Sequence, residues 1–265
     1  MSTSYHVHTV RSDGRSDFDE YIRAAVDAGL EELGFSDHYA LTASGERPWW
    51  SMAPDSLGEY LNTIQAAAAT VKDKLIVRAG VEVDFIPSRL DDIRDALAAH
   101  RFDYLIGSVH FVGDFVVDGS PAPWETSSQD VHNEVCAEYW ALIRRMAETR
   151  LFDIVGHIDV VRKFGFRCSV DMAPLIGQAL DAIKEAGMVV ELNTSGWHTP
   201  SGEAYPEPWI LRECFNRGIP TLVSADAHES GHVTRDFDRA AALLAEIGFT
   251  DVVRFEDRRR IVERR

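Results

Sequence analysis

The chain alternates about seven times between a short apolar segment and a longer segment whose apolar residues recur at helical spacing. Such alternation is typical of βα units, and a series of these units builds a parallel sheet that closes, or nearly closes, into a barrel. We therefore predict an α/β barrel. The expected strands are residues 4–9, 33–36, 75–83, 104–109, 152–155, 188–192 and 221–224. The expected helices are residues 18–29, 57–71, 90–99, 128–149, 172–186, 208–216 and 239–247.

The length and composition of the chain fit one enzyme domain. With 265 residues, of which 45% are hydrophobic, the chain has the size of a single (β/α) barrel. No linker, low-complexity tract or repeat divides it, so we expect one domain over residues 1–265. The net charge of −16 argues against nucleic acid and anionic membranes as partners, because both bind basic surfaces. We expect residues 252–255 to form an edge strand and the basic end, DRRRIVERR, to be a solvated helix.

The three cysteines, Cys136, Cys168 and Cys214, are widely separated and odd in number. Their spacing predicts neither a disulfide framework nor a C-x-x-C metal site, which suits a reducing compartment. The apolar segments are too short to cross a membrane, and the first residues, MSTSYHVH, lack the basic and apolar regions of a signal peptide. We therefore expect a cytoplasmic protein without a membrane partner.

Polar residues follow the carboxyl end of every expected strand. Five strands end in two polar residues separated by one apolar or small residue, and residues two apart point to the same face of a strand. In a barrel of parallel strands these ends converge on one mouth, where the active sites of such barrels lie. The five pairs are His6 and His8, Glu82 and Asp84, His157 and Asp159, Glu191 and Asn193, and Asp226 and His228. The other two strands are followed by Asp37 and His38, and by His110.

A helix cap or an exposed loop residue would explain any one of these positions, and for Asp84, Asp159 and Asn193 both interpretations stay open. Capping does not explain the histidines, which occur at five of the seven strand ends. Gathering that many imidazoles and carboxylates without compensation would cost free energy through desolvation and repulsion between like charges. Divalent cations remove both costs, and roughly ten candidate ligands are too many for one tetrahedral zinc. The residues therefore predict two or three divalent metal ions.

In chain order the motifs are H-x-H, S-D-H, G-V-E, G-S-V-H-F, G-H-I-D, E-L-N-T-S-G and S-A-D-A-H. This ordered set resembles the polymerase and histidinol phosphatase (PHP) superfamily over the whole chain. The segments GSVHF, GHIDVVRKFG and ELNTSG are most similar to its monofunctional histidinol-phosphatase branch. The resemblance implies a single PHP-type metallohydrolase domain with a distorted seven-stranded (β/α), TIM-like barrel. It also implies a trinuclear metal centre at the carboxyl ends of the strands.

The resemblance further implies which residues hold the metals. Glu82 would bridge two ions, and Gly14 would permit a tight turn that folds Asp13 over the site. Alternatively, Asp13 is a turn former or the cap of the helix expected near Phe18. The implied ligands are His6, His8, Glu82 and Asp226 for one ion, Glu82, His110 and His157 for a second, and Asp13, His38 and His228 for a third. Zinc, iron and manganese all suit such mixed shells.

The implied chemistry is hydrolysis of a phosphomonoester, with L-histidinol phosphate of histidine biosynthesis as the expected substrate. The nucleophile would be a metal-bound hydroxide, not a side chain. Asp84 or Asp159 would orient a ligand or act as an acid or base. Arg162 or Lys163 would bind phosphate, and we favour Arg162 because its planar guanidinium offers two donors; pairing with a nearby carboxylate is the alternative. His198, a second candidate, stands where the branch has a phosphate-binding arginine.

Two alternatives to this function stay open. His198 in place of arginine would fit a related enzyme for another small phosphate ester, such as a nucleotide or sugar phosphate. The second alternative is a non-catalytic PHP module, and the complete ligand set counts against it. Aromatic residues near the mouth could stack on an imidazole, cover the site as a lid or pack beneath a loop; they are Tyr39, Trp49, Trp50, Phe111 and Trp197. The sequence does not indicate an oligomeric state.

Overall fold

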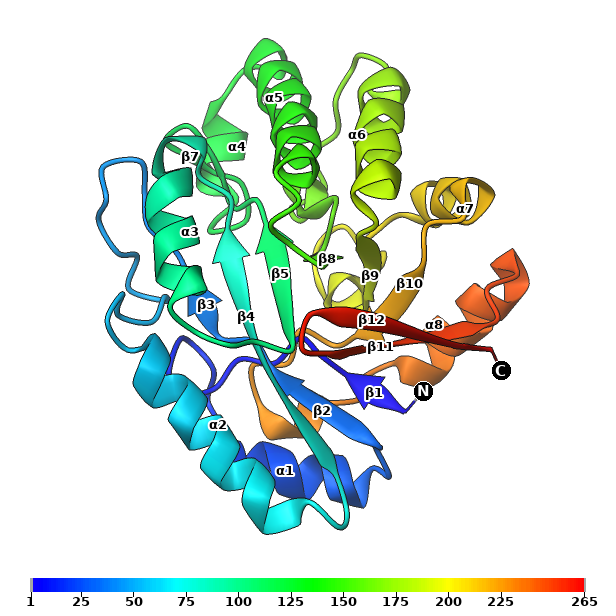
Figure 1. Cartoon of the computed structure of the whole chain (residues 1–265). Coiled ribbons are helices and arrows are strands. Elements are labelled where there is room, and N and C mark those ends of the chain that lie inside the picture. Colours follow the sequence, from blue (N-terminus) through cyan, green and yellow to red (C-terminus); the bar gives the residue numbers. More distant parts are fainter. Residues whose placement is uncertain (1, 265) are drawn as a thin grey trace.

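Seven parallel strands follow one another around a nearly closed barrel (Figure 1). The computed structural model of the chain describes residues 2–264. Neighbouring strands pair in the order β1-β2-β4-β5-β8-β9-β10, and the short β3 pairs with β4. Their bounds are β1 Thr3–Ser4, β2 Glu32–Phe35, β3 His38–Tyr39, β4 Ile76–Asp84, β5 Tyr104–Ser108, β8 Ile154–Val155, β9 Val189–Asn193 and β10 Thr221–Ser224. The prediction of a seven-stranded (β/α) barrel is confirmed.

Backbone hydrogen bonds between the segments that follow β1 and β10 close the barrel. The N–H of His8 donates to the carbonyl of Ala227 at 2.9 Å, and the N–H of Ala227 donates to the carbonyl of His6 at 3.1 Å. These bonds form a single parallel bridge at Val7, so the strand expected over residues 4–9 is interrupted after Ser4. The bridge sets His6 and His8 beside the residues that end β10.

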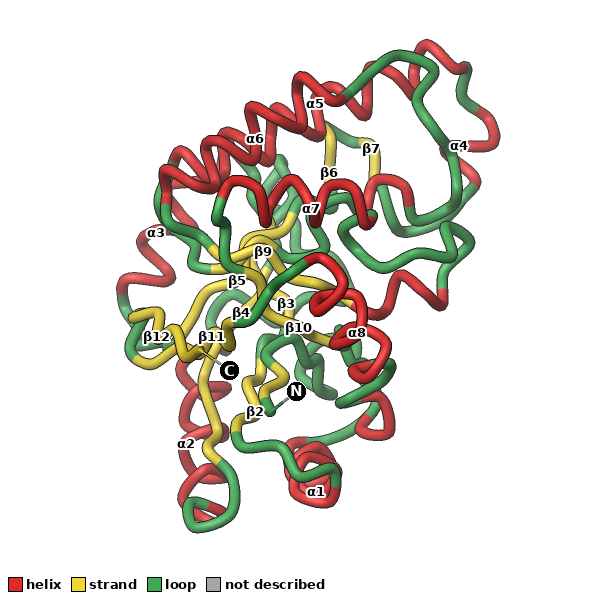
Figure 2. Tube along the Cα trace, turned by 90° about the vertical axis from the view of Figure 1, so that its right-hand side faces the viewer, coloured by secondary structure: helices red, strands yellow, loops and turns green. Residues whose placement is uncertain are grey.

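Helices pack around the barrel strands; in Figure 2 the barrel strands lie near the centre in yellow, and the red helices lie mostly outside them. The helix before β2 begins with a capping box, in which Asp17 accepts from the N–H of Glu20 and Glu20 accepts from the N–H of Asp17. Asp17 therefore caps this helix, and Asp13 does not. The helices are α1 Phe18–Asp27, α2 Leu57–Val71, α3 Leu90–Ala98, α4 Ala122–Thr126, α5 Gln129–Glu148, α6 Ala173–Ala186, α7 Pro208–Arg217 and α8 Phe237–Ile247, with single 3₁₀ turns η1 Pro87–Arg89, η2 Val160–Arg162, η3 Thr194–His198 and η4 Ser230–His232.

The basic end of the chain forms a β-hairpin, so the expected solvated helix is wrong. Strands β11 (Asp251–Glu256) and β12 (Arg259–Arg264) pair antiparallel, which includes the expected strand over residues 252–255. Val253 and Phe255 pack with Tyr5 and Tyr104 against the amino ends of the barrel strands. Arg254, which lies between them, pairs with the barrel carboxylate of Glu32 at 3.2 Å. These tertiary pairs favour a hairpin over an exposed helix. Arg265 lies outside the described residues.

Cys136 on α5 and Cys168 in the loop before α6 form a disulfide, which the sequence did not predict. The two cysteines are 32 positions apart, and only the folding of this loop back onto α5 brings them together. Cys214 on α7 is a buried free thiol. The remaining strands, β6 (Phe111–Val112) and β7 (Phe115–Val116), form a small hairpin beside the mouth. Among the described residues, no helix has both the length and the apolar character needed to cross a membrane.

Candidate metal centre

The carboxylate of Glu82 lies at the centre of a cluster of histidines at the mouth of the barrel. Glu82 is near the end of β4, and its side chain is 1% exposed. Its Oε2 atom lies 2.8 Å from Nδ1 of His38, 3.1 Å from Nε2 of His6 and 3.4 Å from Nε2 of His8. Its Oε1 atom lies 3.0 Å from Nε2 of His157 and 3.8 Å from Nε2 of His110. One carboxylate thus contacts five imidazoles from four segments of the chain that are far apart in sequence.

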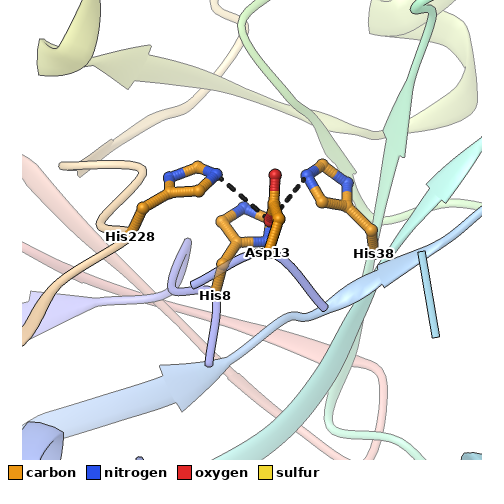
Figure 3. A group of neighbouring side chains, drawn as sticks. All are labelled: His8, Asp13, His38 and His228. Carbon is orange, nitrogen blue, oxygen red and sulfur yellow. Dashed lines mark ion pairs between the residues drawn. The ribbon is translucent and has the colours of Figure 1, made fainter. Parts of the chain in front are cut away.

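The described residues include four groups of three or four side chains that could hold a metal ion. Within each group, one ligand atom from every residue lies within 4.8 Å of the others. All nine residues expected to bind metal occur in them. Figure 3 shows one group, in which His38 and His228 approach Asp13 from opposite sides and His8 lies beside them. The groups are His8, Asp13, His38 and His228; His6, Glu82 and His157; His6, His8 and Asp226; and His38, Glu82 and His110. The mouth can therefore hold several divalent ions.

Several buried nitrogen and oxygen atoms in this cluster form no hydrogen bond of normal geometry, although some of them lie close to one another. They include Nε2 of His6, both ring nitrogens of His8, Nδ1 of His38 and Oε2 of Glu82. Unpaired buried polar atoms cost free energy, which a bound cation would offset. Burial, together with repulsion from His38 and His228, lowers the pKa of His8 to about 3, so this imidazole is neutral as metal binding requires. Burial alone would raise the pKa of Glu82, but His38 and His6 hold it well below its ordinary value.

The turn that carries Asp13 is held by close packing and by Asp37. The N–H of Gly14 donates to the carbonyl of Thr9 at 3.0 Å, and a Cβ atom at Gly14 would lie 1.9 Å from the carbonyl oxygen of His8. Only glycine permits this approach. Buried Asp37 accepts from the N–H and hydroxyl of Thr9 at 2.7 and 2.9 Å and from the hydroxyl of Ser12 at 2.6 Å. Asp37 therefore positions Asp13, a role that we did not assign from the sequence.

Two further carboxylates orient histidines of the cluster. Asp84 accepts from the backbone N–H of His110 at 3.0 Å, and its Oδ2 lies 3.0 Å from Nδ1 of the same ring. Glu191 lies 2.7 Å from Nδ1 of His6 and accepts from the backbone N–H of His157 at 2.8 Å. Such contacts fix the tautomer and direction of a metal-binding imidazole. Glu191 had no role in the sequence interpretation, although its place in an E-L-N pair at a strand end was a signal for one.

Arg162 and His198, the two residues expected to bind phosphate, each contact a carboxylate of the protein. Nε of Arg162 donates to Asp159 at 2.6 Å, and its guanidinium lies over the ring of Tyr205. Nε2 of His198 lies 2.5 Å from Oδ2 of Asp236, and the imidazole is 46% exposed. For Arg162 this is the alternative left open in the sequence analysis, pairing with a nearby carboxylate.

A cavity of about 250 Å³ opens onto the histidine cluster. Indole and phenol rings form part of its wall, namely Trp49, Trp50 and Tyr205. Trp50 packs edge-on against His38 and parallel to Phe111, whereas Trp49 is 81% exposed. The wall includes Lys163 but neither Arg162 nor His198. Among the lysines and arginines of the described residues, only Lys163 lines the cavity.

Asp226 contributes to the mouth from a sparsely populated backbone conformation. Its φ of 50° lies in the left-handed region, which residues other than glycine rarely adopt. Its Oδ1 lies 3.1 Å from Nε2 of His8 and 3.6 Å from Nε2 of His6. Such conformations persist where the surrounding structure enforces them, and they concentrate at functional sites.

Fold and site together define a class of protein, a nearly closed (β/α) barrel whose mouth is built to hold several divalent metal ions.

Comparison with known proteins narrows this class. The chain belongs to the PHP domain family, whose model matches residues 4–195. The protein of Deinococcus radiodurans named "Probable histidinol-phosphatase" is 36% identical over 230 residues, which cover 86% of each chain. The histidinol-phosphatase of Bacillus subtilis is 29% identical over 257 residues, which cover 86% of this chain and 94% of that one.

A solved structure has the same fold. It is the crystal structure of histidinol phosphate phosphatase from Lactococcus lactis complexed with zinc, L-histidinol and phosphate. The two structures superpose with a TM-score of 0.84 at 22% sequence identity, over 98% of both chains.

Proposed function

We propose that this protein is a metal-dependent phosphomonoesterase that hydrolyses L-histidinol phosphate to L-histidinol and phosphate, a step of histidine biosynthesis. The observation that carries the proposal is the position of Glu82 within 3.8 Å of five imidazoles at the mouth of the barrel. The names of the relatives at 36% and 29% identity support this choice of substrate. We also propose that residues 1–265 act as one domain.

Two or three ions of zinc, iron or manganese would be held by the nine residues of the mouth. We assign His6, His8, Glu82 and Asp226 to one ion, Glu82, His110 and His157 to a second, and Asp13, His38 and His228 to a third. Three observations support the assignment. His6, His8 and Asp226 form one group, and Asp13, His38 and His228 lie together in another that also includes His8. Nε2 of His110 lies 3.2 Å from Nε2 of His157, and both rings face Oε1 of Glu82. Divalent ions bound here would acidify a water and neutralise charge on phosphoryl oxygens.

The protein's own residues would orient this chemistry and the substrate. Asp84 and Glu191 would direct His110 and His6, and Asp37 would hold the turn of Asp13. The aromatic wall around Trp49 and Trp50 suits a substrate that carries a flat ring. Asp159 would hold Arg162 and the loop to Glu207 in place. It accepts a hydrogen bond from the backbone N–H of Glu207 at 2.9 Å.

The test is release of phosphate by purified protein loaded separately with zinc, manganese and iron. L-Histidinol phosphate, nucleoside monophosphates and sugar phosphates are compared as substrates, with and without a chelator. We expect the highest kcat/KM for L-histidinol phosphate and loss of activity on chelation. A fully metallated protein that prefers a nucleotide or sugar phosphate would contradict the proposed substrate, and one inert on every ester would contradict the proposed enzyme.

We further propose that the enzyme works in the cytoplasm, where amino acid biosynthesis would supply its substrate. The Cys136–Cys168 disulfide is the observation that weighs against a reducing compartment. Fractionation of cells followed by immunodetection tests this location.

A further inference from the structure

Two charged residues outside the candidate metal ligands line the cavity, Asp118 and Lys163. Nζ of Lys163 lies 3.3 Å from Oδ2 of Asp118 and donates to it. The side chain of Lys163 is 31% exposed and that of Asp118 is 22% exposed, so water reaches both in part. Within residues 2–264, no second hydrogen bond holds either side chain. A negative and a positive charge thus face the reaction site with only each other as a hydrogen-bonding partner, while Nζ of Lys163 also lies 5.9 Å from the centre of the Phe164 ring.

Both residues lie in segments that follow a histidine of the cluster in the chain and are hydrogen-bonded back to it. The N–H of Val117 donates to the carbonyl of His110 at 2.9 Å, which sets Asp118 next to that histidine. The N–H of Val160 donates to the carbonyl of His157 at 2.8 Å, and the N–H of Lys163 donates to the carbonyl of Val160 at 2.8 Å. The β6–β7 hairpin and η2 therefore bring the pair to the His110 and His157 side of the centre.

The charges of the pair match those of one class of substrate. A phosphomonoester is mostly dianionic at neutral pH, and a primary aliphatic amine is protonated there. An amino-alcohol phosphate therefore carries both signs, and it can give each member of the pair a new partner. A partly exposed ion pair contributes little to stability, so exchanging its partners is easy. An ester without an amine would leave Asp118 uncompensated beside a phosphate dianion, which is unfavourable.

We propose that Asp118 and Lys163 determine specificity, with Lys163 binding the phosphoryl group and Asp118 binding the protonated amine of an amino-alcohol phosphate. This inference rests on the proposed function and deepens it. It predicts selection for the amine of the substrate, independently of its ring.

The test compares L-histidinol phosphate with its deamino analogue, 3-(imidazol-4-yl)propyl phosphate, at saturating metal. We expect the wild type to prefer the amine-bearing ester by at least about tenfold in kcat/KM, because a charge-assisted hydrogen bond is lost with the analogue. Asp118→Asn should lower kcat/KM for L-histidinol phosphate about 10- to 100-fold, mainly through KM, and leave the analogue unaffected or better hydrolysed. Lys163→Met should lower kcat/KM for both esters by similar factors.

Asp114→Asn is the matched control, because Asp114 is an exposed carboxylate in the same hairpin and does not line the cavity. It should behave as wild type with both esters. Metal content is measured for every variant. Calorimetry gives a second readout, in which Asp118→Asn weakens binding of L-histidinol and Lys163→Met weakens binding of inorganic phosphate.

The possible failures are distinguishable. A wild type that hydrolyses neither ester contradicts the proposed function itself. A wild type that hydrolyses both esters equally well overturns the inference alone, and this measurement requires no variant to fold. Equal losses on both esters in Asp118→Asn would also overturn it, because they indicate a structural role.

Discussion

Oε2 of Glu82 lies 2.8 Å from Nδ1 of His38, deep in the mouth of the barrel. The opposite oxygen of Glu82 faces His157 at 3.0 Å, so the carboxylate joins two sides of the cluster. A carboxylate in this position can bridge two cations, and the hydroxyl of Ser108 fixes its direction through a 2.6 Å hydrogen bond.

Glu82→Gln should lose more bound metal than Asp159→Asn. The amide removes a negative charge that several ligands share, whereas Asp159 contacts Arg162 and the loop to Glu207. Asp159→Asn should retain its metal but lose about 1.5 to 3 kcal/mol of unfolding free energy, because it removes the charged hydrogen-bond partner of a largely buried guanidinium whose next carboxylate, Glu207, lies 3.8 Å away. Metal analysis and urea denaturation of both variants provide the measurement. Equal loss of metal in the two variants would mean that Glu82 is not a bridging ligand.

Glu191→Gln should weaken metal binding about 10- to 100-fold without removing a ligand. The reason is its 2.7 Å contact with Nδ1 of His6, which orients the opposite ring nitrogen toward Glu82. Competition with a chelator of known affinity measures the effect. Glu203→Gln, a change of the same type at a residue outside the cluster, serves as the control, and equal affinities in the two variants would exclude a role for Glu191.

Metal binding should release protons and strengthen as pH rises. Burial alone would lower the pKa of His110, but Asp84 and Asp118 raise it to about 10 from the ordinary 6.5. A raised pKa stabilises the metal-free fold fully below pH 6.5, and this contribution is lost as pH rises toward 10. In the folded chain His110 keeps its proton until the pH approaches about 10, so a metal ion must displace it and metal affinity rises with pH up to that value.

Calorimetry of zinc binding in buffers of different ionisation enthalpy measures this proton release. Asp84→Asn should reduce the release, because it removes the carboxylate that holds the proton on His110. Zinc binding without any proton exchange at neutral pH would contradict the assignment of His110 as a ligand.

His198→Arg should leave the dependence of KM on pH unchanged. His198 lies against Asp236 and outside the cavity wall, so its charge does not face a bound phosphate. We expect parallel curves of KM for wild type and variant between about pH 6 and 9, with values within about twofold of each other. A KM that rises with pH in the wild type, but rises less in the variant, would show that His198 supplies a titrating charge after all.

The disulfide predicts one free thiol in the unreduced, denatured protein and three after reduction. Cys136 and Cys168 enclose a sequence separation of 32 residues, so their cross-link should stabilise the fold by about 3 to 4 kcal/mol in the chain-entropy estimate. Thiol titration and mass spectrometry count the thiols, and urea denaturation of Cys136→Ser measures the stability. Cys214→Ser, which removes the free thiol, is the control; three free thiols without reduction would contradict the pairing.

The sequence alone determined the barrel and the histidine-rich mouth. Both depend on local periodicity, because side chains two apart share a face of a strand and parallel strands bring all their carboxyl ends together. His6, His8, His110 and His157 therefore identified the site before any contact was known. The resemblance to the PHP superfamily then indicated the chemistry, and the family match supports it.

Only the tertiary structure decided which charges face the cavity. Arg162 and Lys163 are adjacent in sequence, yet one pairs with Asp159 and the other lines the cavity with Asp118. The sequence could not distinguish them, because the η2 turn sets their directions and Asp118, the partner of Lys163, is 45 positions away in the chain. The tertiary structure also decided three other features: the contact of Glu191 with His6, the disulfide and the C-terminal hairpin. Each joins residues with no periodic relation in sequence, so the energy that selects it exists only once the chain is folded.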